Sequence, residues 1–274
     1  MPEFSTITKV MRAIGSNRVF LLLITPYRRY RRKSSKSARA SIVALSGQNI
    51  SAKSKFETIY KDRLWSKSSP TLLPSNSLSG HGSTAESTVA LRSQLEDLIR
   101  AEGPEVFFDA PCGDFVWMKL VHFPESCGYI GGDIVQALID ELNKSESYAA
   151  DLEHPRGPRF RKFIACDLTQ SEFPQADFWL CKDCVQHLSN ADIVMLLRNF
   201  ARSSVKTALI SNHTDVAENS DINTGDFRHV DLTKPPFSLP PPRKTLVDRP
   251  VDGEQREIAV WNREDVLPAI GRLT

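Results

Sequence analysis

The sequence predicts an α/β fold with a doubly wound, mostly parallel sheet. From residue 105 to about residue 211, short apolar runs typical of strands alternate with segments of helical spacing. Three of the strand-like runs end in an acid, at Asp109, Asp133 and Asp167. A tight turn, Pro111 to Gly113, follows the first of them. Because parallel strands in such a sheet end at one shared crevice, the acids and the turn predict a ligand site there.

The predicted elements follow in order along the chain. The expected strands are Val106–Asp109, Gly128–Asp133, Phe160–Asp167, Ala176–Cys181 and Thr207–Ser211, with one late strand, Glu257–Trp261, placed to close the sheet. The expected helices are Ala85–Ala101, Phe115–Val121, Val135–Asn143 and Ala191–Ser203. After residue 212 the pattern changes to polar loops and proline clusters, which predict irregular connections.

The three acids suit different parts of a nucleoside cofactor. Asp133 suits the ribose hydroxyls, because ionised carboxylate oxygens only accept hydrogen bonds. Asp167 suits the exocyclic amine of adenine, with Leu168 against the ring, and Asp109 suits the polar tail of the cofactor. Gly113 lacks a Cβ atom and lets a ligand approach the backbone. The alternative is that each acid caps the helix that follows its strand.

Composition indicates a globular protein of the cytoplasm. Hydrophobic residues make up 41% and charged residues 25% of the chain, and the net charge of +2 predicts no specific nucleic-acid binding. The five cysteines are odd in number, and most lie in apolar runs, which favours free thiols in a reducing compartment. Cys181 and Cys184 form a single pair, whereas a structural zinc site usually needs four ligands, so the sequence predicts packing and no metal.

Three regions are expected. Residues 1–55 form a basic, disordered extension, residues 56–104 a lid and helix, and residues 105–274 the ligand-binding domain. The apolar run Val19–Ile24 is shorter than the roughly 20 residues of a spanning helix, and no cleavage site of a signal peptide follows it. The basic extension therefore predicts, at most, weak peripheral membrane contact. The basic residues within residues 1–40 are Lys9, Arg12, Arg18, Arg28, Arg29, Arg31, Arg32, Lys33, Lys36 and Arg39.

These motifs resemble those of the class I S-adenosylmethionine-dependent methyltransferases, over about residues 79–262. Asp109-Ala-Pro-Cys-Gly-Asp114 is similar to their first motif, Gly131-Gly-Asp133 to the second and Cys166-Asp-Leu168 to the third. Pro111 and Phe115 stand where the first motif usually has glycine. Together with Ser79–Thr84 and Lys182–Ser189, the motifs resemble one bacterial subgroup whose first motif reads Asp-Ala-Pro-Cys-Gly-Asp-Phe.

The resemblance implies a Rossmann-like methyltransferase fold, S-adenosyl-L-methionine as cofactor and an N-terminal loop and helix that cover it. The implied acceptor is a hydroxyl of a small molecule or glycan. The expected cofactor contacts are Asp109, Ala110, Gly113, Asp133, Ile134, Asp167, Leu168 and Lys182.

Methyl transfer requires in-line positioning and removal of a proton from the acceptor. His187 is the expected base because imidazole titrates near neutrality. Asp183 lies four residues earlier and would share a helical face with it. His213 is a weaker rival, and the alternative for His187 is packing beside the cofactor.

Two other functions are weighed. An NAD-linked oxidoreductase could use the same acids but predicts a Gly-x-Gly-x-x-Gly turn, which Asp109–Phe115 does not supply. A non-catalytic adaptor with a retained cofactor fold predicts loss of the strand-end acids, which are present.

Overall fold

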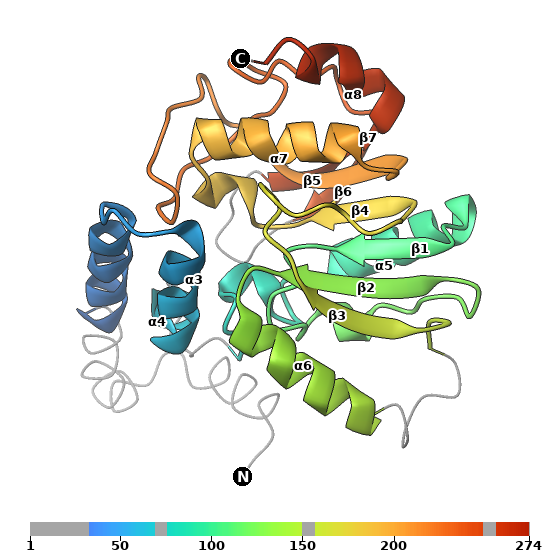
Figure 1. Ribbon diagram of the computed structural model, residues 1–274, viewed down its shortest axis with the longest axis horizontal. Coiled ribbons are helices and arrows are strands. Elements are labelled where there is room, and N and C mark those ends of the chain that lie inside the picture. The colour runs from blue at the N-terminus through green and yellow to red at the C-terminus, as the bar shows by residue number, and fades with distance from the viewer. Residues whose placement is uncertain (1–32, 69–75, 150–156, 249–255, 274) are drawn as a thin grey trace, which may run out of the picture.

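A sheet of seven strands forms the centre of the protein in the computed structural model, which describes residues 33–68, 76–149, 157–248 and 256–273 (Figure 1). The strands are β1 Val106–Asp109, β2 Gly128–Asp133, β3 Arg161–Ala165, β4 Phe178–Cys181, β5 Thr207–His213, β6 Lys244–Asp248 and β7 Arg256–Asn262. Their order is β3-β2-β1-β4-β5-β7-β6, and only β7 runs antiparallel to its neighbours. The order reverses between β1 and β4, where ligand crevices form in such sheets.

Helices cover both faces of the sheet. Helices α5 Val89–Glu102 and α6 Gln136–Ala149 cover one face, and α7 Asn190–Arg202 and α8 Arg263–Ile270 cover the other. Alternate residues of a strand enter opposite cores: Phe107 of β1 packs with α5 and α6, and Phe108 with α7. The predicted α/β, doubly wound architecture is therefore confirmed.

The structure differs from the prediction at one expected helix and at strand β6. The segment expected to be helical over Phe115–Val121 contains only a short 3-10 turn, Met118–Leu120. Phe115 has a φ of 58°, a left-handed conformation that interrupts a helix, and its ring packs on Tyr129 and Phe163. Strand β6 was not predicted, because it lies at the sheet edge and buries only alternate residues of a short segment.

The N-terminal region is helical where the structure describes it. Residues 33–46 form a helix, followed by α3 Ala52–Lys61 and α4 Leu64–Ser68. The prediction of disorder over residues 1–55 is wrong for this part, because Ile42 and Leu45 bury their side chains against Ile59 and Leu64. Val19–Ile24 and most of the basic extension lie outside the described residues.

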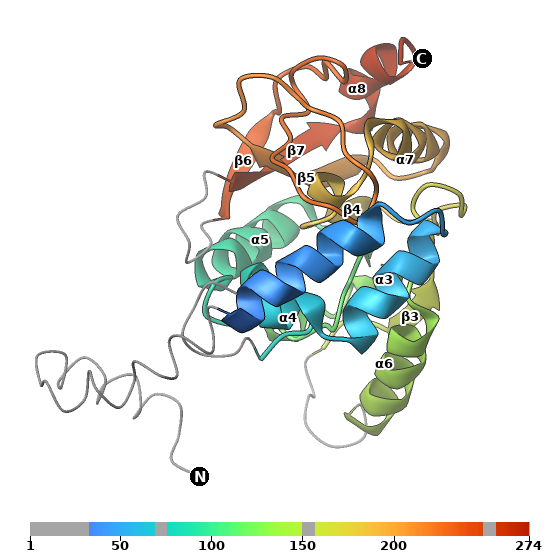
Figure 2. The same cartoon turned by 90° about the vertical axis from the view of Figure 1, so that its left-hand side faces the viewer.

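The N-terminal helices lie beyond the carboxyl ends of the parallel strands. Figure 2 shows the helix over residues 33–46 and α3 side by side across that end of the sheet. No helix in the described part of the chain is both long and apolar enough to cross a membrane. The placement encloses a space between the strand ends and the N-terminal helices.

Candidate active site

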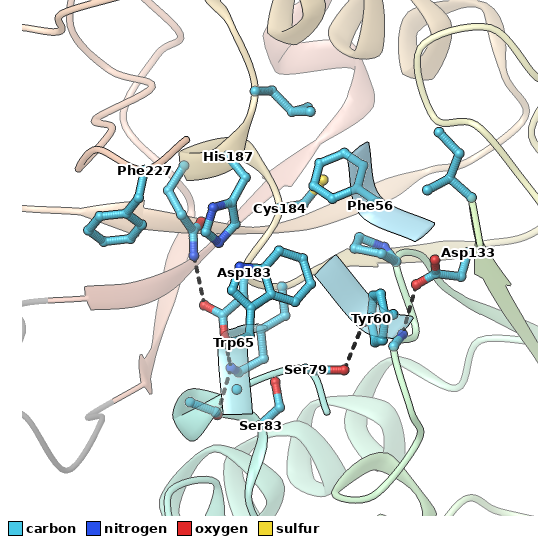
Figure 3. A pocket seen from close by; sticks show the side chains of 18 of the residues that line it. Phe56, Tyr60, Trp65, Ser79, Ser83, Asp133, Asp183, Cys184, His187 and Phe227 are labelled. Carbon is cyan, nitrogen blue, oxygen red and sulfur yellow. Dashed lines mark hydrogen bonds and ion pairs between the residues drawn. The ribbon is translucent and has the colours of Figure 1, made fainter. Parts of the chain in front are cut away.

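A cavity of about 550 Å³ occupies this space (Figure 3). Its wall includes the ends of β2 and β4, the turn after β1 and side chains of the N-terminal helices. Of the predicted site residues, those that line it are Gly113, Asp133, Ile134, Asp167, Leu168, Lys182, Asp183 and His187. Asp109 and Ala110 are not among the lining residues. Strand ends distant in sequence thus meet at one site, as the fold predicts.

Asp133 contributes a buried carboxylate to the cavity wall. Its Oδ2 accepts a hydrogen bond from the backbone N–H of Gly113 at 3.1 Å, and its Oδ1 accepts one from Val135 at 3.0 Å. Burial raises the pKa of Asp133 to about 6, against the lowering effect of these N–H donors. Gly113 has a φ of 57°, and a Cβ atom there would lie 2.3 Å from Ser79 Oγ. The turn therefore requires glycine where it meets the loop before α5.

Asp109 lies next to the cavity residues but faces the core. Its Oδ2 accepts a hydrogen bond from Tyr129 Oη at 2.6 Å, and the residue is 2% exposed. Burial raises the pKa of Asp109 to about 7, opposed by the Tyr129 hydroxyl and further raised by Asp133. Asp109 shares the strand face of Phe107 and so points toward the α5 and α6 core. The expected contact with a cofactor tail finds no support in this position.

Asp167 stabilises the turn after β3 and also lines the cavity. Its Oδ1 accepts hydrogen bonds from the backbone and hydroxyl of Thr169, and its Oδ2 accepts one from Gln170. These bonds stabilise the turn after β3, whereas the alternative expected a helix there, and β3 is followed by β4 with no helix between them. The residue still lines the cavity, beside Leu168. Each carboxylate oxygen can accept more than one hydrogen bond, so a ligand amine remains compatible with this turn.

A cluster of buried charges lies at the end of β4. The Asp183 carboxylate forms ion pairs with Arg256 Nη1, at 2.8 Å, and with Lys182. The Asp248 carboxylate lies 2.8 Å from Arg256 Nε and 3.6 Å from Lys182 Nζ. Burial favours a higher pKa for Asp183, but Arg256 and Lys182 outweigh it and hold the pKa well below its ordinary value. Lys182 also donates to the carbonyl of Gly82 at 3.0 Å. The predicted cofactor contact Lys182 therefore ties the N-terminal loop to the strand end.

His187 lies at the opposite end of the cavity from Asp133. It ends a short 3-10 turn, Val185–His187, and its Nδ1 lies 2.8 Å from the carbonyl oxygen of Asp226. Burial lowers the pKa of His187 below 6.5. The predicted pairing with Asp183 on one helical face is wrong, because Asp183 has a φ of 55° and the turn begins only after it. Asp226 supplies the orienting contact instead.

His213, the weaker candidate for the base, does not line the cavity. It is fully buried at the end of β5. Its ring stacks on that of His229, with the two ring centroids 4.4 Å apart. Burial, followed by the neighbouring His229, lowers the pKa of His213 to about 4. Its position fits a packing role in the loops after β5.

The loop over residues 77–84 is held against the turn after β1. Asp114 accepts hydrogen bonds from the Ser77 hydroxyl at 3.0 Å, from the Leu78 backbone N–H and from the Ser79 hydroxyl at 3.3 Å. Tyr60 Oη lies 2.9 Å from Ser79 Oγ, which links α3 to the same turn. The N-terminal region thus forms part of the cavity wall, as expected for the lid.

Several cavity residues were not predicted from the sequence. Tyr60 and Trp65 line the cavity, although neither was predicted as a site residue. Asp248 and Arg256 come from β6 and β7, far along the chain from the Asp183 they surround. No sequence pattern links these residues, because their proximity depends on sheet pairing.

The cysteines carry free thiols, and Cys184 alone is partly exposed. Cys181 is fully buried in β4, which agrees with packing. Within the described ranges, no group of three or more His, Cys, Asp or Glu side chains is arranged to hold a metal ion.

Solved structures of similar fold include methyltransferases. No protein-family model matches the sequence, and a search of curated proteins found no match. The chain is similar to magnesium protoporphyrin IX methyltransferase (ChlM) from Synechocystis PCC 6803 with bound SAM, at 12% identity and a TM-score of 0.51, over 78% of this chain and 98% of that chain. The chain has a Rossmann-like methyltransferase fold.

Two further structures share this fold. Mitomycin 7-O-methyltransferase MmcR matches at 13% identity and a TM-score of 0.50, over 85% of this chain and 68% of that chain. PigF with SAH matches at 12% identity and a TM-score of 0.53, over 92% of this chain and 72% of that chain. The match to PigF extends over nearly the whole chain, so it includes part of the N-terminal region as well as the sheet.

Proposed function

We propose that this chain is an S-adenosylmethionine-dependent methyltransferase that methylates a hydroxyl oxygen of a small-molecule or glycan acceptor. The observation that carries the proposal is the pairing of Asp133 with the Gly113 backbone on one wall of the cavity. The candidate base His187 lies at the other end of the same cavity. The first motif, Asp109–Phe115, further supports membership of the bacterial subgroup that it resembles.

The residues present fit the cofactor. Asp133 would accept hydrogen bonds from both ribose hydroxyls, since its carboxylate lines the cavity at the end of β2. Ile134 and Leu168 would contact the adenine ring, with Asp167 near its amine. Gly113 lines the cavity in the turn after β1, beside which the polar tail would lie. In this assignment Asp109 supports the site from the core side, and Lys182 and Asp183 hold the loop and the strand end.

The reaction needs one proton acceptor from the protein. Bound S-adenosylmethionine would supply an electrophilic methyl group on a sulfonium. Transfer would join the acceptor oxygen to the methyl carbon as the carbon–sulfur bond breaks, with S-adenosylhomocysteine as the leaving group. His187 Nε2 accepts the proton of the acceptor hydroxyl and then releases it to solvent. Its lowered pKa keeps the imidazole neutral and ready to accept that proton.

Calorimetric titration with S-adenosylhomocysteine tests the cofactor assignment. Asp133→Ala should weaken binding by about 10-fold to 150-fold, because a hydrogen bond to a charged group contributes roughly 1.5–3 kcal/mol. Asp140→Ala is the matched control, since Asp140 is an exposed acid of α6. Equal affinity of the Asp133 variant and the unmodified protein would overturn the assignment. A titration with NAD in place of S-adenosylhomocysteine tests the oxidoreductase alternative.

We also propose that the enzyme works in the cytoplasm and that residues 1–40 make weak peripheral contact with an acidic membrane surface. Free thiols at Cys112, Cys127, Cys166 and Cys181 support a reducing compartment. The excess of Lys and Arg in the N-terminal segment supports the membrane contact.

A further inference from the structure

We infer that the methyl acceptor is a small planar aromatic molecule that carries hydroxyl groups. This inference rests on the proposed methyl transfer, and it narrows the acceptor from any hydroxyl compound to one chemical class. Three features of the cavity lead to it: an aromatic wall, two exposed apolar side chains and a small set of buried polar atoms without partners.

The aromatic wall runs from the cofactor end of the cavity to the candidate base. The ring centroids of Tyr60 and Trp65 lie 5.3 Å apart. The centroid of His187 lies 5.1 Å from that of Trp65 and 5.6 Å from that of Phe227. Figure 3 shows Phe227, His187, Trp65 and Tyr60 in this order across the cavity, with Asp133 beyond Tyr60. Aromatic faces and edges favour contact with another aromatic ring by about 0.5–1.5 kcal/mol for each pair. The wall therefore favours a flat, unsaturated acceptor.

Two exposed apolar side chains line the cavity, in addition to the exposed Arg39. Phe227 is 45% exposed and Val43 is 56% exposed, and both side chains line the cavity. They come from opposite parts of the chain, the loop after β5 and the helix over residues 33–46. Exposed large apolar side chains that gather at a cavity mark a binding surface for an apolar ligand.

Gln186, Trp65 and His81 line the cavity, and each has a buried polar atom without a hydrogen-bond partner among the residues that the structure describes. Gln186 is 2% exposed, and its Nε2 donates to Asp183 Oδ1 at 3.1 Å, which leaves its Oε1 without a donor. Trp65 Nε1 is likewise buried without an acceptor. A polar group left unpaired in the interior costs free energy, which a ligand hydroxyl can recover. A hydroxyl group on an aromatic ring could pair with these atoms while the ring contacts the aromatic wall.

The size of the cavity agrees with a small acceptor. Pockets for single small molecules commonly measure roughly 300–1,000 Å³. The cavity of about 550 Å³ must hold the nucleoside cofactor as well as the acceptor. The space at the His187 end therefore suits one or two fused rings.

A matched pair of probes tests aromaticity with the hydroxyl groups held constant. The full chain, saturated with S-adenosylhomocysteine, is titrated calorimetrically with 2,3-dihydroxynaphthalene and with its saturated counterpart, decahydronaphthalene-2,3-diol. Methyl α-D-glucoside is the glycan probe. The aromatic diol should bind at least about tenfold more tightly than either other probe, as expected for one or two added ring contacts.

Variants locate the binding to this wall. Phe227→Ala and Trp65→Leu should each weaken binding of the aromatic diol by about tenfold, whereas Trp65→Phe should keep most of it. Because Phe227 is exposed, its variant should fold even if Trp65→Leu does not. Met195→Ala is the control, since Met195 is an exposed apolar residue of α7 that does not line the cavity.

The outcomes separate this inference from the proposed function. Failure to bind S-adenosylhomocysteine would count against the methyltransferase itself. Normal S-adenosylhomocysteine binding with equal or tighter binding of the saturated diol or the glucoside would overturn the aromatic acceptor alone. Preference for the aromatic diol that survives both Phe227→Ala and Trp65→Leu would also overturn it, because the ring would then bind elsewhere.

Discussion

The Nδ1 atom of His187 lies 2.8 Å from the carbonyl oxygen of Asp226. A carbonyl oxygen can only accept a hydrogen bond, so Nδ1 carries the proton and the neutral ring keeps a free lone pair on Nε2. The loop after β5 thereby sets the tautomer of the candidate base. The arrangement places a proton acceptor at the end of the cavity opposite Asp133.

Replacement of His187 should separate chemistry from cofactor binding. His187→Ala is expected to lower turnover by roughly 10²-fold to 10⁴-fold, the usual contribution of a general base. The affinity for S-adenosylhomocysteine should stay near that of the unmodified protein. Steady-state rates and calorimetric titration measure the two effects. His122→Ala, a change at a histidine on the surface, is the control.

The pH profile of the same reaction gives an independent check. Burial lowers the pKa of His187 below 6.5, so the imidazole stays neutral to a more acidic pH than an exposed histidine. The rate should therefore fall on the acid side only below pH 6.5, as the ring gains a proton, and this limb should be absent in His187→Ala. A loss of cofactor affinity that accounts for the whole loss of activity would favour the packing role.

Asp109→Asn is expected to stabilise the protein at alkaline pH. Folding raises the pKa of Asp109 from 3.8 to about 7, because the carboxyl is buried. The free energy of unfolding therefore falls as the pH rises between these two values. Asn cannot ionise and can still accept the Tyr129 hydrogen bond. The Tm of the variant should thus exceed that of the unmodified protein at pH 8 and differ little from it at pH 4. Each kcal/mol of added unfolding free energy should raise Tm by about 2–4 °C. Thermal unfolding at both pH values measures this.

Cofactor titration of the same variant tests the position of Asp109. Because Asp109 does not line the cavity, the affinity for S-adenosylhomocysteine should remain close to normal. Asp97→Asn, at an exposed acid of α5, controls for a general effect of charge on Tm. A loss of affinity comparable to that of Asp133→Ala would instead restore the contact with the cofactor tail.

Asp114→Ala should release the loop over residues 77–84. The change removes the acceptor of three hydrogen bonds from Ser77, Leu78 and Ser79. Faster amide hydrogen exchange in this loop and weaker S-adenosylhomocysteine binding, by about tenfold or more, are expected because the loop forms part of the cavity wall. Glu86→Ala, at an exposed acid after the same loop, should change neither quantity. Faster exchange without loss of affinity would show that the loop does not contribute to cofactor binding.

The sequence by itself determined the alternation of strands and helices between Val89 and His213, because burial of one face imposes a period of two or 3.6 on apolar residues. It also determined that Asp133 and Asp167 reach the cavity, since parallel strands end at one edge of the sheet. These are local patterns, and they identified one wall of the candidate site. They did not show that the Asp109 side chain points away from the cavity. The sequence pattern of an acid at a strand end is the same whichever face of the sheet its side chain occupies.

Only the tertiary structure decided what closes the site. Trp65 contacts His187 because the N-terminal helices pack over the strand ends. Arg256 contacts Asp183 because β7 pairs with β5. Such contacts leave no periodic trace, because they depend on where whole elements pack and not on the spacing of residues within one element. The left-handed backbone of Phe115 and Asp183 was likewise set by its surroundings, since local propensity disfavours that conformation for both residues.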